Sequence, residues 1–318
     1  MIHMTDYSST MSKDFLSILD LEHADLVRLL NLALQVKQER PLGRNASTAS
    51  VLSGRHVAML FEKSSLRTRS TFEIAIRELG GETLDVPPEM ADGTREPLED
   101  VARNLERWVD ALVIRTFAHQ KAAAVAAAAS RMHVVNALTD EQHPCQALAD
   151  FVTLRERWSS FKGRRIAYVG DGNNVAVSLT HAAAMLGVSV HVASPVGYEL
   201  PDRVVAEAAR VARDGAEVRR YTDPAAAVRG VDAIYTDVWT SMGQEDTAEE
   251  RRVAFVDYQV NERLMSLAAP RACFMHCLPA HRGEEVTADV MESDASIVFD
   301  QAENRLHAQK ALLLMLLS

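Results

Sequence analysis

A short apolar run followed by a basic turn and an amphipathic segment constrains the fold of this chain more than any other feature. Residues His56–Phe61 are almost all apolar, which predicts a buried strand. Phe72, Ile76 and Leu79 then recur at helical spacing, and a pair of glycines ends the segment. Strand, turn and helix in this order are typical of α/β domains with parallel sheets.

The turn between this strand and this helix is rich in cations and hydroxyl groups. Ser65, Arg67, Thr68 and Arg69 lie together, directly before the apolar helical positions. At a helix N-terminus the free backbone N–H groups and the helix dipole favour an anion, and the arginine fork matches phosphate oxygens. The turn therefore predicts a phosphate site. The alternative is a capped helix with a solvated basic first turn.

The alternation of short apolar runs and helical segments continues along the chain. Further strands are predicted at residues 111–114, 133–137, 165–169, 188–193, 233–235 and 273–275. Helices are predicted at residues 19–36, 98–109, 121–130 and 146–158, and in the segment that ends at 186. A length of 318 residues suggests two domains of about 150 residues each. We therefore predict two Rossmann-like domains, 1–150 and 151–318, each a parallel sheet flanked by helices, with the C-terminal helix packing back on the first domain.

Composition argues against several kinds of partner. The net charge is −10, which disfavours nucleic acid. No apolar run reaches the roughly 18 residues of a membrane helix, and no basic segment followed by an apolar stretch marks a signal peptide. Cys145, Cys273 and Cys277 are too few for a disulfide framework and fit a reducing compartment. We therefore expect a cytoplasmic protein that binds neither nucleic acid nor membrane.

A second candidate site begins at His143, in a His-Pro-Cys-Gln run after a predicted strand. His143 and Gln146 are three residues apart at a helix start, so both can face the same space. They offer an imidazole donor and an amide donor to a carbonyl oxygen, and the alternative is local capping. Zinc binding by His143 and Cys145 is disfavoured, because no second pair stands at metal-ligand spacing.

The run from Gly170 to Asn174 follows a predicted strand and opens a helix, as dinucleotide-binding turns do. Val175 stands where the third glycine of that fingerprint belongs, which disfavours a nicotinamide cofactor. Two asparagines instead bring amide groups to the carboxyl end of the strand, where open α/β sheets bind ligands.

Three later residues each allow a functional and a structural interpretation. Asp237 follows a predicted strand and is either the counter-charge of an ammonium group or a solvated loop carboxylate. Cys277 is either a buried structural thiol or a polarizable or thiolate partner of a cationic substrate. Arg305 either neutralises an anion or lies at the surface.

Four motifs together resemble the transcarbamylases, and specifically the ornithine carbamoyltransferase family. They are the carbamoyl-phosphate signature at residues 65–69, His-Pro-x-Gln at 143–146, Asp-x-Trp-x-Ser-Met-Gly at 237–243 and His-Cys-Leu-Pro at 276–279. They occur in the family's order across nearly the whole chain. The last two motifs distinguish ornithine enzymes from aspartate transcarbamylases, which share only the carbamoyl-phosphate half.

The resemblance implies a role for each motif residue. Phosphate binding is implied for Ser65, Leu66 (through its backbone), Arg67 and Thr68, with Arg305 completing the anion site. Carbamoyl phosphate would also be held by Arg115, His143, Gln146, Cys277 and Leu278. Ornithine would be held by Asn174, Asp237, Ser241 and Met242. Catalysis would rest on Arg115, on His143, which polarises the carbonyl group, and on Cys277, which faces the substrate amine.

The implied reaction transfers the carbamoyl group of carbamoyl phosphate to L-ornithine, which gives L-citrulline and phosphate in arginine metabolism. The amine attacks the carbonyl carbon, an oxyanion forms and phosphate leaves, and neither a metal nor a cofactor is required. Such enzymes look like two α/β domains that close over the substrates, assembled as homotrimers, or multiples of trimers, with shared active sites. Two alternatives stay open: transfer to another amine or a modified ornithine, and a non-catalytic ligand-binding paralogue.

The chain departs from the family pattern in two places. Leu66 stands where the family usually has Thr, so a backbone contact survives there and a hydroxyl contact does not. The loop at 87–97, which we expect to be exposed and mobile, lacks the family's Gln that reaches a neighbouring subunit. Our hypothesis is that Arg95 takes over that contact.

Overall fold

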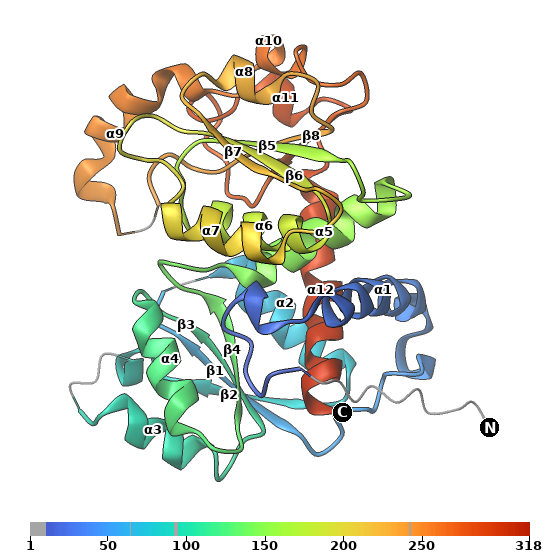
Figure 1. The fold of residues 1–318 in the computed structure, drawn as a ribbon. Coiled ribbons are helices and arrows are strands. Elements are labelled where there is room, and N and C mark those ends of the chain that lie inside the picture. Colours follow the sequence, from blue (N-terminus) through green and yellow to red (C-terminus); the bar gives the residue numbers. More distant parts are fainter. Residues whose placement is uncertain (1–10, 64, 92–94, 242) are drawn as a thin grey trace. The chain divides into compact units, whose positions relative to one another are not determined.

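The computed structural model describes residues 11–63, 65–91, 95–241 and 243–318, which fall into two compact units. Unit 1 contains the chain up to Val152 together with Glu303–Ser318, and unit 2 contains Thr153–Ala302. Each unit is a parallel sheet flanked by helices (Figure 1), which confirms the predicted fold class. None of the helices formed by the described residues combines the length and apolarity needed to span a bilayer.

Unit 1 is built on a four-stranded sheet with the order β2-β1-β3-β4. Its strands are β1 (His56–Phe61), β2 (Glu82–Val86), β3 (Ala111–Arg115) and β4 (His133–Leu138). The helices α3 (Leu98–Leu105) and α4 (His119–Ala128) cover one face (Figure 1), where Leu60, Leu112 and Val125 share an apolar core. The helices α1 (His23–Glu39) and α2 (Leu66–Glu78) and the end of α12 (Val298–Leu317) lie on the other face. Short 3₁₀ helices occur at Ile18–Asp20, Arg40–Asn45 and Pro88–Ala91.

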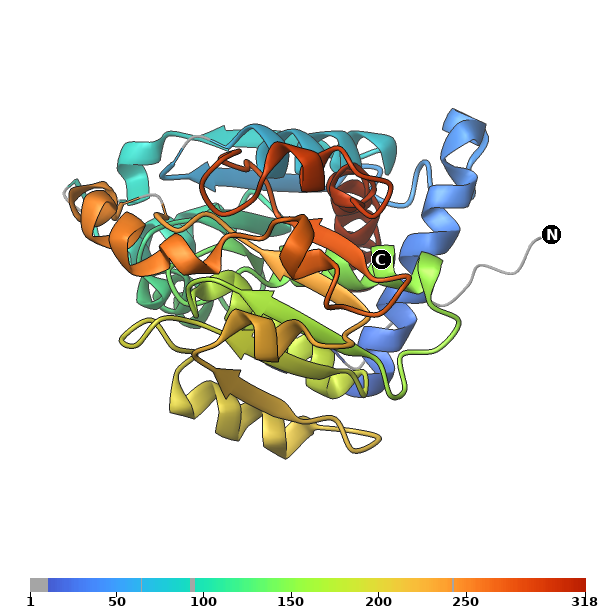
Figure 2. The same ribbon diagram turned by 90° about the horizontal axis from the view of Figure 1, so that it is seen from above.

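Unit 2 is built on a five-stranded sheet with the order β7-β6-β5-β8-β9 (Figure 2). Its strands are β5 (Arg165–Val169), β6 (Ser189–Ala193), β7 (Val218–Tyr221), β8 (Ala233–Thr236) and β9 (Cys273–His276). One face carries α6 (Asn174–Met185) and α7 (Asp202–Val211), and the other carries α8 (Pro224–Val228), α10 (Glu262–Met265) and α11 (Ala288–Met291). The remaining helices are α5 (Pro144–Arg157), which leads in from unit 1, α9 (Ala248–Phe255), and the 3₁₀ turns Glu245–Thr247 and Val256–Tyr258.

Most predicted elements are present, with bounds that differ by a few residues. The helix predicted at 19–36 begins later, at His23, because Ser17 and Asp20 form a reciprocal capping box around a separate 3₁₀ turn. In the 87–97 stretch, Pro88–Ala91 forms a 3₁₀ turn, and residues 92–94 lie outside the described part of the chain. Two strands, β2 and β7, were not predicted.

The strand order creates one switch point in each sheet. In unit 1 the chain leaves β1 toward β2, whereas β3 lies on the opposite side of β1. In unit 2 it leaves β5 toward β6, whereas β8 lies on the opposite side of β5. Connections that diverge in this way leave a crevice at the carboxyl ends of the strands, where open α/β sheets bind ligands. The candidate residues follow these strand ends.

Candidate functional site

The start of α2 presents the first group of candidate residues. Ser65 has an extended backbone at the N-cap position, and its side chain makes no capping hydrogen bond with the helix. Leu66 is 79% exposed, so its side chain packs little, and its backbone N–H lies in the first turn. Thr68 is buried and Arg67 is half-buried. Arg69 forms ion pairs with Glu73 and Asp85, which assigns it a structural role.

Two buried arginines converge on this turn in unit 1. Arg115 ends β3, and its Nη1 donates to Ser65 Oγ at 3.0 Å and more weakly to Thr68 Oγ1 at 3.5 Å. Arg305, on α12, donates from Nη2 to the same Thr68 hydroxyl and from Nη1 to Gln146 Oε1. Arg115 is 6% exposed and Arg305 is 2% exposed. Two guanidinium groups that reach the same threonine hydroxyl give this turn positive charge, which favours binding of an anion.

His143 lies beside these arginines with its imidazole uncharged. Burial lowers the pKa of His143 well below its ordinary value, and the charges of Arg305 and Arg115 lower it further. A neutral imidazole next to two guanidinium groups is suited to donate a hydrogen bond to a carbonyl oxygen that gains negative charge.

Gln146 is oriented differently from the sequence-based expectation of an amide donor. Its Nε2 donates to Asp150 Oδ1 at 2.8 Å, and its Oε1 accepts from Arg305. The reason is that a carboxylate only accepts hydrogen bonds and a guanidinium only donates them. Cys145, between His143 and Gln146, donates to the carbonyl of Asn136, and burial raises the pKa of its thiol to about 12. Cys145 is therefore an inert packing residue.

In unit 2 the central group is the carboxylate of Asp237, which follows β8. Its Oδ1 accepts from the Cys277 thiol at 2.9 Å, and its Oδ2 accepts from Asn173 Nδ2 at 2.9 Å. Asn173 also caps α6, since its Oδ1 accepts from the N–H groups of Val175 and Ala176. Asp237 is 6% exposed and Cys277 is half-buried. A fixed carboxylate beside a thiol is suited to bind an amine.

The loop that carries Cys277 is held by buried polar contacts. His276 Nδ1 accepts from the N–H of Leu278 at 2.9 Å, and its Nε2 lies 3.1 Å from Glu285 Oε1. The imidazole is therefore the tautomer protonated at Nε2. The backbone N–H of His276 donates to Gln301. Leu278 has a positive φ of 59°, which L side chains rarely adopt and which such surrounding contacts maintain.

The other candidates of unit 2 occupy the same strand ends. Asn174 is half-buried in the first turn of α6, whereas its neighbour Asn173 is the one that contacts Asp237. Ser241 is half-buried, and its backbone N–H donates to Gln244 Oε1 at 3.2 Å. Met242 lies outside the described residues.

The glycines of the Gly170 to Asn174 run serve backbone packing. A Cβ at Gly172 would approach the backbone nitrogen of Leu200 to 2.4 Å, so no larger residue fits there. Gly170 has a φ of 143°, in the region that favours glycine. Together with the capping role of Asn173, this accounts for the run without a dinucleotide.

Comparison with known proteins identifies the family. The profile described as "Aspartate/ornithine carbamoyltransferase, carbamoyl-P binding domain" matches residues 13–156, and the one described as "Aspartate/ornithine carbamoyltransferase, Asp/Orn binding domain" matches residues 162–316. The chain belongs to the aspartate/ornithine carbamoyltransferase family. An ornithine carbamoyltransferase from Acidothermus cellulolyticus is 50% identical over 96% of this chain and 97% of that protein. Another from Parasynechococcus marenigrum is 47% identical over 98% and 95%.

Solved structures show the same similarity. The ornithine carbamoyltransferase from Pyrococcus furiosus has a TM-score of 0.90 and 45% identity, covering 96% of each chain. That from Thermus thermophilus has a TM-score of 0.87 and 43% identity, covering 97% of this chain and 100% of that one. The resemblance drawn from the four motifs is thereby confirmed.

Two groups among the described residues bring metal-capable atoms within 4.8 Å of one another. One is Asp237, His276 and Cys277, and the other is His281, Glu284 and Glu285. In the first group both ring nitrogens of His276 already have hydrogen-bond partners, and Asp237 accepts from Cys277. Metal binding there would require loss of these contacts, so the hydrogen bonds explain the group better than a metal does.

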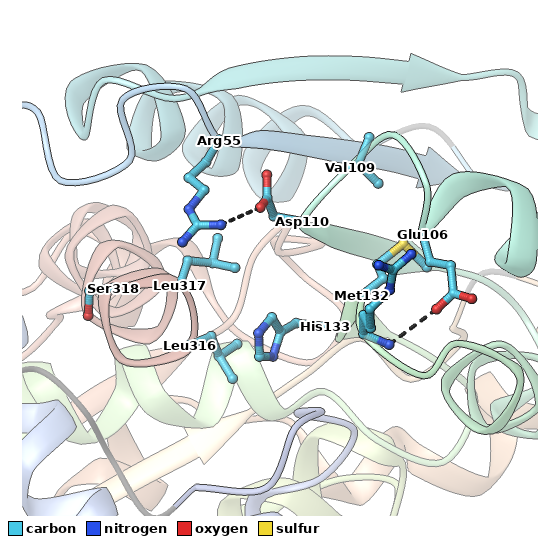
Figure 3. A pocket seen from close by; sticks show the side chains of 10 residues that line it. Arg55, Glu106, Val109, Asp110, Met132, His133, Leu316, Leu317 and Ser318 are labelled. Carbon is cyan, nitrogen blue, oxygen red and sulfur yellow. Dashed lines mark hydrogen bonds and ion pairs between the residues drawn. The ribbon is translucent and has the colours of Figure 1, made fainter.

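A cavity of about 420 Å³ in unit 1 lies away from the candidate residues (Figure 3). It is lined by Arg55, Asp110 and His133, which precede or begin β1, β3 and β4, and by the end of α12. These are the amino ends of the strands, whereas Arg115 and Thr68 lie at the carboxyl ends. The Arg55–Asp110 ion pair at 2.6 Å neutralises charge within it. Because of this position and this neutralised charge, we do not assign the cavity as the functional site.

Proposed function

We propose that this chain transfers the carbamoyl group of carbamoyl phosphate to the side-chain amine of L-ornithine, giving L-citrulline and phosphate. Membership of the aspartate/ornithine family makes it a carbamoyl-group transferase. The observation that carries the proposal is the cluster of Arg115, Arg305 and Thr68 beside a neutral His143 in unit 1. It combines an anion site with a carbonyl-polarising group, as carbamoyl phosphate requires.

Unit 1 is the proposed carbamoyl-phosphate-binding domain. The phosphate is held by the first turn of α2, through Ser65, Leu66 (backbone N–H), Arg67 and Thr68, and by Arg115 and Arg305. Their positive charge stabilises phosphate as it leaves. The carbonyl oxygen accepts hydrogen bonds from His143 and Arg115, and Gln146 holds the carbamoyl group. The motif resemblance also assigns Cys277 and Leu278 to carbamoyl-phosphate binding.

Unit 2 is the proposed ornithine-binding domain. Asp237, Asn174, Ser241 and Met242 hold the amino-acid end of ornithine, and Cys277 faces the side-chain amine. A carboxylate that already orders a thiol and an amide supports the recognition of an ammonium group. The Asp-x-Trp-x-Ser-Met-Gly loop favours an α-amino acid over putrescine as the acceptor.

The reaction needs an uncharged amine, which is mostly protonated at neutral pH because its pKa is about 10.4. After proton loss, the nitrogen lone pair forms a bond to the carbonyl carbon, and the carbonyl electrons move to the oxygen. These electrons return as the bond from carbon to the phosphate oxygen breaks, and phosphate departs with that electron pair. The first proton leaves to solvent before the attack. The second proton, which the nitrogen carries once its bond to carbon has formed, passes to the departing phosphate or, where Cys277 has lost its thiol proton, to that sulfur. His143 and Arg115 stabilise the oxyanion between the two steps.

We also propose a homotrimer, or a multiple of trimers, in which neighbouring chains share active sites. Arg95, which lies in the stretch where the family carries its inter-subunit Gln, is the candidate for the contact with a neighbour's carbamoyl phosphate. Light scattering would then give three times the chain mass of 35.1 kDa, or a multiple of that trimer mass. A cytoplasmic location is supported by the three cysteines, all of which are free thiols.

The decisive experiment measures product from carbamoyl phosphate with ornithine, lysine and putrescine offered in parallel. We expect equal amounts of citrulline and phosphate with ornithine, and little product with the other amines. Product only with lysine or putrescine would show that the acceptor is wrong. If a folded trimer forms no product with any amine, the enzyme function is wrong and a non-catalytic ligand-binding paralogue is favoured.

A further inference from the structure

Asp150 is a fully buried carboxylate that neither the motifs nor the proposed mechanism uses. It lies on α5, four residues after Gln146, so the two side chains lie on the same face of the helix. Gln146 Nε2 donates to Asp150 Oδ1 at 2.8 Å, and Asp150 is 0% exposed. A charge buried this completely is costly, which suggests that the contact serves a purpose beyond packing.

The contact determines which end of the Gln146 amide faces the substrate side. Asp150 Oδ1 accepts a hydrogen bond from Gln146 Nε2, so Asp150 takes the Nε2 end of the amide. Arg305 can only donate, so it takes the Oε1 end. Rotation of the amide by half a turn would place two donors together at Arg305 and two acceptors together at Asp150. The amide is therefore held in a single orientation from both sides.

Arg305 links this orientation to the anion site. It donates from Nη1 to Gln146 Oε1 and from Nη2 to Thr68 Oγ1, which Arg115 also approaches. A continuous chain of contacts thus runs from Asp150 through Gln146 and Arg305 to Thr68. All four residues belong to unit 1, and each is at most 2% exposed.

We propose that Asp150 is a positioning residue that makes the site selective for a carbamoyl group. This inference rests on the proposed function. The two ends of a carbamoyl group need different partners, because its oxygen accepts hydrogen bonds and its NH₂ group donates them. His143 and Arg115 supply donors for the oxygen. Gln146 Oε1, kept outward by Asp150, has a second lone pair that accepts from the NH₂ group.

Acetyl phosphate is the probe that isolates this contact. It carries the same phosphate and the same carbonyl group, but a methyl group replaces the NH₂ group. The wild type should bind carbamoyl phosphate more tightly than acetyl phosphate by about tenfold or more, since a site built to accept a hydrogen bond rejects an analogue that lacks the donor. The preference should depend on Asp150.

The test is calorimetric titration of both phosphates into the wild type and the Asp150→Asn variant. An asparagine accepts from Gln146 only through a neutral amide oxygen, which holds the amide less firmly than a carboxylate does. We expect carbamoyl phosphate to bind about ten- to thirtyfold more weakly and acetyl phosphate to change by less than about threefold. The double variant Gln146→Glu with Asp150→Asn should recover part of the preference, because the introduced carboxylate can only accept, both from the introduced amide and from Arg305.

Asp25→Asn is the matched control, since Asp25 is another buried carboxylate of unit 1, on α1. It should leave both affinities unchanged. The inference is overturned if Asp150→Asn keeps the preference for carbamoyl phosphate, or if both ligands weaken equally together with the thermal stability. Failure of the proposed function would look different, because the wild type itself would then form no citrulline.

Discussion

The ionisation state of His143 offers a direct test of the candidate site. Burial, Arg305 and Arg115 all lower the pKa of this imidazole well below the ordinary value of 6.5. The ring should therefore be neutral at neutral and mildly acidic pH, ready to donate to the oxyanion as it forms. The perturbation that reveals this is His143→Gln, combined with a change from about pH 7.5 to about pH 5.0.

The size of the effect follows from proton linkage. In the unfolded chain His143 takes up a proton as the pH falls through about 6.5, whereas in the folded chain its lowered pKa moves this uptake to lower pH. The unfolded state then binds more protons, so the free energy of unfolding falls with decreasing pH. The 1.5 pH units between 6.5 and 5.0, at 1.36 kcal/mol each, set an upper limit of about 2 kcal/mol on the stability that His143 costs the wild type at pH 5.0. In the His143→Gln variant the free energy of unfolding should not show this decrease.

The assay is urea unfolding of both proteins at the two pH values. Burial also lowers the pKa of His181, His191 and His307, but these residues are common to both proteins and cancel in the difference. Imidazole ¹⁵N shifts provide a second readout, in which the His143 signal should titrate well below the ordinary value of 6.5. Equal losses of stability in the two proteins, within about 0.5 kcal/mol, would refute the reasoning. So would a His143 signal that titrates near 6.5.

Three other predictions concern single contacts. Leu66→Pro should weaken phosphate binding about tenfold, because proline removes the N–H in the first turn of α2. Leu66→Ala keeps this donor and should change phosphate binding by less than about threefold, so equal effects of the two variants in a phosphate titration would contradict the prediction. Asp237→Asn should raise the KM for ornithine about tenfold or more and leave the KM for carbamoyl phosphate unchanged, since the lost charge is the proposed partner of the ornithine ammonium group. Initial rates measured with each substrate varied would contradict this if the KM for ornithine did not change. Arg95→Ala should weaken carbamoyl-phosphate binding to the assembled enzyme by about tenfold, and an unchanged affinity would rule out its inter-subunit role.

The strands that could be predicted from sequence are those buried on both faces. β1 and β5 lie inside their sheets and consist of nearly continuous apolar runs, so periodicity alone predicts their bounds. β2 and β7 are edge strands, with most positions exposed or half-exposed. Their sequences, Glu82–Val86 and Val218–Tyr221, mix charged and apolar residues and resemble loops. Pairing with a neighbouring strand, and not the local sequence, makes them strands.

The same distinction between local and distant information applies to the candidate site. Ser65 and Thr68 could be proposed as candidates for an anion site because the strand, the turn and the helix start lie within a few residues of each other. Arg305 reaches the same hydroxyl from 237 residues further along the chain, and nothing near it marks it as more than a surface arginine. Asp150 is an intermediate case. Its spacing of four residues from Gln146 was visible, but the sequence could not show that the carboxylate is buried, and only burial makes it able to orient the amide. Candidates for ligand binding can thus be proposed from motifs, whereas candidates for orienting them depend on a burial that the folded chain alone reveals.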